Sequence, residues 1–174
     1  MEGAPQLKMA KRRYTLYTAL LATLMMLGLY VLLGVWPFGG GTVINGDLGG
    51  LYLNFYAHFK RVLLGEAGFA YTFSKGLGGS MVGLFAYYCA SPYNLLYLLS
   101  PERWMPVMAS VVLLVKVVLD CVTFRLYITA KVPRLGWRSV ALGLCYGFMA
   151  YAFAYAQNPM WHDCLLMLPL MCLG

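Results

Sequence analysis

The chain has 174 residues, of which 61% are hydrophobic and only 11% are charged. A soluble domain of ordinary composition carries about 25% charged residues, so this composition is typical of a polytopic membrane protein. The net charge is +7, but the basic residues gather beside apolar runs instead of covering a soluble face, and we expect no nucleic-acid partner.

The first apolar run covers residues 14–35 and contains no charge. It is long enough to cross about 30 Å of hydrocarbon, and it exceeds the apolar stretch of about 7–15 residues found in signal peptides. We therefore predict an uncleaved span. Because cytoplasmic segments are rich in Lys and Arg, the N-terminus is expected inside, on the evidence of the residues before the run: Lys8, Lys11, Arg12 and Arg13.

Three more apolar runs follow, at about 106–127, 139–156 and 164–174. A basic loop at 128–139 supports the same orientation. The last run is too short to cross a bilayer before the chain stops. We expect residues 1–174 to be the N-terminal part of one multi-pass domain in the bacterial cytoplasmic membrane. Such a piece is expected to be inactive alone.

Residues 36–104 are expected to form a large outer loop. This region holds most of the glycines and two apolar stretches, at 48–64 and 81–99, that are too short or too interrupted to be spans. We interpret both stretches as amphipathic helices that lie at the membrane surface. The predicted fold class is therefore an all-α polytopic membrane protein with surface helices in its first extracytoplasmic loop.

Asp47 is one of only six acidic residues in the chain, and it lies just after the first span. At 100° per residue, Asp47 shares one helix face with Asn54, His58 and Arg61. Such a row suits a polar head group, because Arg61 can pair with a phosphate and Asp47 can accept a proton from a hydroxyl. The alternative is a solvated face with Asp47 as the helix N-cap.

Two lysines are further candidates for contact with an anion. Lys75 lies in a glycine-rich segment that lacks P-loop spacing, so we expect turns there and a point charge available to a phosphate. Lys116 lies four residues before Asp120 in the second predicted span. Ionisable groups at membrane depth usually pair or line a cavity. The two residues either neutralise each other, or Lys116 meets an anionic lipid head group, or both line a proton or ion pathway.

Asp163 follows a short polar turn and is the candidate for a second acidic position. It either caps the fourth helix or faces Asp47 as a second carboxylate on the outer side. With the neighbouring histidine, two carboxylates could bind a divalent metal, but no ligand pattern supports a metal and the cofactor stays unknown. The five cysteines match no zinc spacing and are interpreted as packing residues.

Several distinct short motifs follow one another along most of the chain after residue 36. They are Pro37-Phe38-Gly39, Asp47-Leu48 with Tyr52, Gly76-Leu77-Gly78-Gly79, the stretches at 83–88 and 91–96, Leu114 to Lys116, and Asn158-Pro159-Met160-Trp161 with Asp163 and Pro169. In these motifs the chain resembles the YfhO family of bacterial membrane proteins, which belongs to the GT-C class of glycosyltransferases. One departure is Leu51, where the family tends to have Gln.

The resemblance implies a GT-C-like enzyme that transfers a sugar from a polyprenyl-phosphate donor to an envelope polymer such as teichoic acid, on the outer face of the membrane. Asp47 would be the catalytic base and Asp163 the second acidic position. The phosphate leaving group needs cations, for which Arg61, Lys75 and Lys116 are the candidates. Two alternatives remain: a transporter or flippase of a lipid-linked substrate that uses Lys116 and Asp120, and a non-catalytic membrane scaffold.

Overall fold

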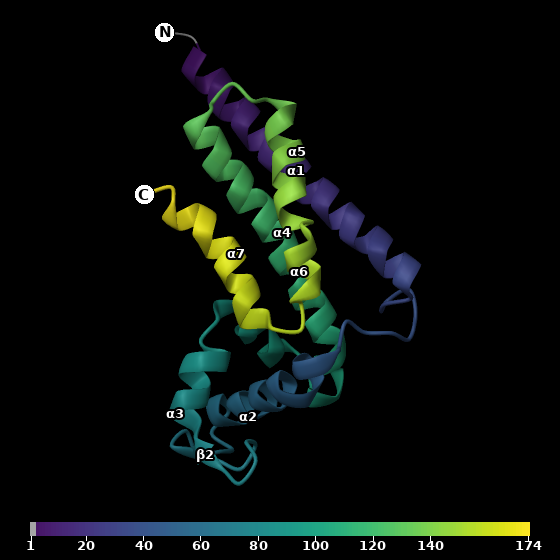
Figure 1. Cartoon of the computed structure of the whole chain (residues 1–174), viewed down its shortest axis with the longest axis vertical. Helices are drawn as coiled ribbons and strands as arrows, with labels where there is room; N and C mark the ends of the chain where they lie inside the picture. The colour runs from purple at the N-terminus through teal and green to yellow at the C-terminus, as the bar shows by residue number, and fades with distance from the viewer. Residues whose placement is uncertain (1–2) are drawn as a thin grey trace. The chain divides into compact units, whose positions relative to one another are not determined.

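The computed structural model describes the backbone of residues 3–174 and the side chains of residues 12–174, so the side chains of Lys8 and Lys11 lie outside the described residues. Most of this part of the chain is helical (Figure 1). The α-helices are α1 (Gly3–Leu33), α2 (Leu53–Leu63), α3 (Met81–Leu84), α4 (Met105–Lys131), α5 (Trp137–Gly147), α6 (Ala150–Ala154) and α7 (Pro159–Met171). Two π turns, η1 (Leu48–Tyr52) and η2 (Phe85–Cys89), two 3-10 helices, η3 (Pro92–Leu99) and η4 (Glu102–Trp104), and two short strands, β1 (Tyr71–Thr72) and β2 (Gly79–Ser80), complete the elements.

The chain divides into two compact units, which we describe separately. The first unit comprises Met1–Leu33, Leu114–Ala156 and Trp161–Gly174. The second unit comprises Gly34–Leu113 and Gln157–Met160. The helices α4 and α7 contribute residues to both units.

In the first unit, α5 packs closely against α1 and α4 (Figure 1). The contact needs residues without side chains, because a Cβ on Gly143 would lie 2.6 Å from the carbonyl oxygen of Cys121 and 3.4 Å from Thr18. Small residues allow this approach between helices in a membrane, where dispersion contacts drive packing. At the start of α5, the Trp137 ring stacks on Tyr17 with ring centroids 5.0 Å apart.

Two helical segments of the described residues are long and apolar enough to cross a membrane, Arg12–Leu33 and Glu102–Lys131. They correspond to the predicted spans at 14–35 and 106–127. The stretch predicted as one helix at 139–156 is divided instead into α5 and α6, because the backbone of Met149 is extended. The last helix, α7, begins earlier than predicted, at Pro159.

The second unit is built around an aromatic core. The helical run η1–α2 places Tyr52, Phe55, Tyr56 and Phe59 on one face, at the i, i+3, i+4, i+7 spacing of an amphipathic helix, and all four are buried. Tyr56 stacks on Tyr97 of η3, with ring centroids 4.7 Å apart. The predicted helix at 48–64 is thus present, and the stretch predicted at 81–99 is divided into α3, η2 and η3. Their placement at a membrane surface stays a prediction.

The glycine-rich segment that contains Lys75 forms the turn of a small hairpin. Strand β1 pairs antiparallel with β2, with Tyr71 opposite Ser80 and Thr72 opposite Gly79. Between the strands, Gly76 and Gly78 adopt positive φ angles of 48° and 101°, which side-chain-bearing residues rarely take. The glycines therefore serve a tight turn, as the sequence indicated.

Candidate functional site

Asp47 lies directly before η1 and is exposed. Its backbone is already helical, with φ −65° and ψ −27°, and its side chain makes no capping hydrogen bond. An N-cap residue ordinarily takes an extended backbone conformation, from which its side-chain oxygen reaches the backbone N–H groups of the first turn. The interpretation of Asp47 as a helix cap is therefore wrong, and its carboxylate is available to other partners.

Tyr52 stands one turn after Asp47 and joins two of the motifs noted in the sequence. Its side chain is buried, its hydroxyl donates to Oδ1 of Asn158 at 3.2 Å, and its ring packs edge-on against Tyr88. Burial raises the pKa of Tyr52 to about 12, with further contributions from Tyr88 and from the charge of Asp47. The hydroxyl therefore stays protonated at neutral pH and continues to donate to Asn158.

Asn54, His58 and Arg61 come together as predicted. With Ala57 of the same helix and Ser74 of the hairpin loop, they line an open pocket of about 300 Å³ in the second unit. Asp47 is not among the lining residues. A π turn holds more residues per turn than an α-helix, so η1 shifts the angular position of Asp47 away from the one expected at 100° per residue.

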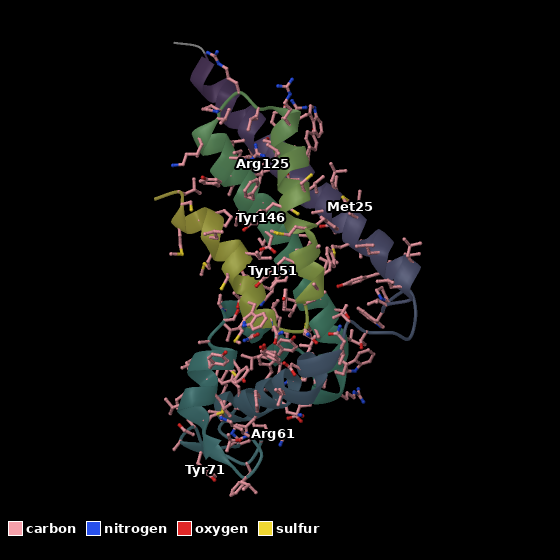
Figure 2. The ribbon with its side chains drawn as sticks, viewed as in Figure 1. Met25, Arg61, Tyr71, Arg125, Tyr146 and Tyr151 are labelled. Atoms are coloured by element: carbon pink, nitrogen blue, oxygen red, sulfur yellow. The ribbon has the colours of Figure 1, made fainter. Side chains whose placement is uncertain are left out.

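Arg61 is already paired with a carboxylate. Its Nε donates to Oε1 of Glu102 at 2.7 Å and its Nη2 to Oε2 at 2.6 Å, a bidentate arrangement that raises the pKa of Arg61. Both side chains are exposed. Arg61 is labelled in Figure 2. No sequence pattern indicates this pair, because Glu102 lies 41 residues away. A phosphate at Arg61 would have to displace Glu102, whereas Lys75 is exposed on the hairpin loop.

The first unit contains a cluster of four ionisable side chains, of which three are buried. Nζ of Lys116 lies 2.6 Å from Oδ1 of Asp163, and Nδ1 of His162 lies 3.2 Å from Oδ2 of Asp120. Lys116, Asp120 and His162 are at most 2% exposed. Lys116 thus forms an ion pair with Asp163 of another helix. Its predicted mutual neutralisation with Asp120 stays a prediction. Asp163 also lies inside α7, so it does not cap that helix.

A second buried cation lies further along α4. Arg125 is 1% exposed, and its Nη1 donates to the hydroxyl of Thr15 on α1 (Figure 2). In the sequence, Arg125 lies just before the basic loop at 128–139, and nothing there indicates a partner for it. Its contact with α1 is therefore a structural finding, and it ties the two long helices together.

Among residues 12–174, whose side chains the structure describes, no group of three or more His, Cys, Asp or Glu is arranged to hold a metal ion. Asp47 belongs to the second unit and Asp163 to the first. Their predicted pairing as two facing carboxylates therefore stays a prediction.

Comparison with known proteins identifies one family. The model of the bacterial membrane protein YfhO matches residues 18–174, which is nearly the whole chain. No curated protein and no solved structure matches it. The match agrees with the two long apolar helices and includes the residues around Asp47, Tyr52 and Asn158. The chain therefore belongs to the YfhO family of bacterial membrane proteins.

Proposed function

We propose that the protein is a membrane glycosyltransferase that moves a sugar from a polyprenyl-phosphate donor to a hydroxyl of an envelope polymer such as teichoic acid, on the outer face of the bacterial membrane. The observation that carries the proposal is the carboxylate of Asp47. It is exposed, it caps no helix, and it stands in the unit that contains Tyr52, Asn158 and the glycine turn of the sequence motifs.

The proposed reaction needs one base and one stabilised leaving group. Asp47 accepts the proton of the acceptor hydroxyl while the hydroxyl oxygen forms a bond with the anomeric carbon. The bond between that carbon and the donor phosphate breaks, and the polyprenyl phosphate leaves with the electron pair. A cation at the phosphate stabilises the departing charge. Lys75 is better suited to this role than Arg61 or Lys116, because both of these are held in ion pairs.

The test is the sugar content of the envelope polymers in a strain that lacks the gene. The strain is complemented with the whole gene, as wild type, as Asp47→Asn or as Glu66→Gln, an exposed carboxylate outside the proposed site that serves as the control. We expect wild type and Glu66→Gln to restore the missing sugar and Asp47→Asn to restore none at equal protein levels. Full restoration by Asp47→Asn would refute the role of Asp47 as the base.

A second candidate function is transport of a lipid-linked substrate. The observation in its favour is the largely buried cluster of Lys116, Asp120, His162 and Asp163, since ionisable groups inside membrane helices often mark transport pathways. Movement of the lipid-linked sugar across vesicle membranes would then fail with Asp120→Asn and survive Asp47→Asn. A scaffold, the third possibility, would tolerate both substitutions.

A further inference from the structure

The pocket on α2 carries no unbalanced charge when His58 is neutral. Its volume of about 300 Å³ lies at the lower end of the range found for small-ligand sites. Arg61 is the only residue with a permanent charge among those that line it, and Glu102 neutralises that charge through two hydrogen bonds. An anion entering the pocket would therefore compete with a carboxylate that is already bound.

The remaining lining groups offer both donors and acceptors. Nδ2 of Asn54 donates to the carbonyl of Gly50, which leaves the side-chain oxygen as an acceptor. His58 adds an imidazole ring to the lining, and its enclosed Nε2 has no hydrogen-bond partner among the described residues. Ser74 adds a hydroxyl, and its backbone N–H donates to Oγ1 of Thr72, which holds the loop residue in place. Mixed neutral donors and acceptors suit hydroxyl groups, each of which donates one hydrogen bond and accepts others.

We propose that this pocket binds the hydroxyl groups of an uncharged sugar or polyol and does not bind a phosphate. The preference follows from the charge balance at Arg61 and from the neutral groups around it. The assignment of these hydroxyls to the donor sugar or to the acceptor polymer rests on the proposed function. The binding preference itself can be measured without any transfer reaction.

The chain contains two histidines, which makes a direct measurement possible. In protein labelled with carbon-13 at histidine and held in lipid nanodiscs, His58 reports on the pocket and the buried His162 serves as an internal control. The probes are methyl glycosides of glucose, galactose and N-acetylglucosamine, then glycerol, then inorganic phosphate at equal ionic strength. We expect a glycoside to shift the His58 resonance alone, with a dissociation constant on the order of 1–10 mM, typical of an open site with few hydrogen bonds.

The different probes separate the sources of the hydroxyls. A response to a glycoside indicates the sugar, and a response to glycerol alone indicates an acceptor polyol; both support the proposal. A response to phosphate alone, or to no probe, would overturn it. Because this measurement does not depend on Asp47, the pocket assignment can fail while transfer in cells still requires Asp47, and the reverse also holds.

Substitutions at the ion pair test the charge argument. Glu102→Gln frees the guanidinium of Arg61, so we expect phosphate to shift the His58 resonance in this variant. Arg61→Gln removes a donor and is expected to weaken glycoside binding about fivefold. Arg103→Gln, an exposed neighbour outside the pocket, is the matched control and should change neither response. If phosphate remains without effect on Glu102→Gln, the charge balance does not determine the ligand and the argument is wrong.

Discussion

The two units treat charged side chains in opposite ways. In the first unit, Lys116, Asp120 and His162 are enclosed and have ionisable partners. In the second unit, Asp47, Arg61 and Glu102 are exposed, and the interior is aromatic. Burying a charge is costly unless it is paired, whereas an exposed charge keeps its water and can exchange that water for a ligand. The contrast indicates that charges stabilise the interior of the first unit, whereas the charges of the second unit lie at its surface, where a ligand can reach them.

The largest expected effect is the loss of the buried cation. Lys116→Met leaves Asp163 without its partner at 2.6 Å and leaves the enclosed Asp120 beside an uncharged side chain. Breaking a buried ion pair by removing one partner typically costs about 3–5 kcal/mol. We expect a much lower unfolding temperature in detergent and a low yield of folded protein. The double variant Lys116→Met with Asp163→Asn should recover part of the loss, because the unpaired carboxylate is gone.

An unchanged melting temperature for Lys116→Met would mean that the cluster is solvated or carries no charge. The first unit would then resemble the second in its treatment of charge, and the comparison would lose its physical basis. Circular dichroism across a thermal ramp measures the transition for all three proteins.

Close helix packing in the first unit predicts the next effect. A Cβ on Gly147 would lie 2.9 Å from the carbonyl oxygen of Val117 and would collide with Sγ of Cys121, whereas a Cβ on Gly28 of α1 meets nothing within 4 Å. Overpacking of this kind typically costs about 1–3 kcal/mol. Gly147→Ala should therefore lower the melting temperature, while Gly28→Ala should leave it unchanged or raise it, since Ala favours helix. Equal behaviour of the two variants would contradict the close contact of α4 with α5.

The sequence predicted the two long helices and the face shared by Asn54, His58 and Arg61, because both follow from local periodicity. It could not identify partners across the chain. The spacing of Lys116 and Asp120 indicated a common helix face, but helical spacing carries no information about a third residue, Asp163, on another helix. The pairing of Arg61 with Glu102 was missed for the same reason. The π turn at η1 also could not be predicted from helical periodicity, which assumes 100° per residue.

A smaller effect is expected at the hydrogen bond between Tyr52 and Asn158 in the second unit. Tyr52→Phe removes the donor and should cost about 1 kcal/mol at neutral pH. Because the folded-state pKa is about 12 against an ordinary value of 10, the protonated hydroxyl favours folding below pH 10, and this contribution is lost as the pH rises from 10 to 12. The stability of wild type should therefore fall more steeply over this range than that of Tyr52→Phe. The free energy of unfolding is measured by urea unfolding at several pH values. If it falls equally with pH in both proteins, Tyr52 is not buried in the folded protein.

The smallest expected effect on stability concerns the other ion pair, that of Arg61 with Glu102. Its geometry is as close as that of Lys116 with Asp163, 2.6 Å in both cases, but its side chains are 50% and 41% exposed. Water screens exposed pairs, and many of them contribute nothing measurable. Glu102→Gln should therefore barely change the melting temperature, and 0.5 M salt should remove any difference, because at high ionic strength surface charges are screened within a few ångströms. A loss comparable to that of Lys116→Met would show that the two units do not differ in how they use charge. A negligible loss of stability, together with the change in ligand preference expected for this same variant, would show that the pair contributes to ligand recognition and not to folding.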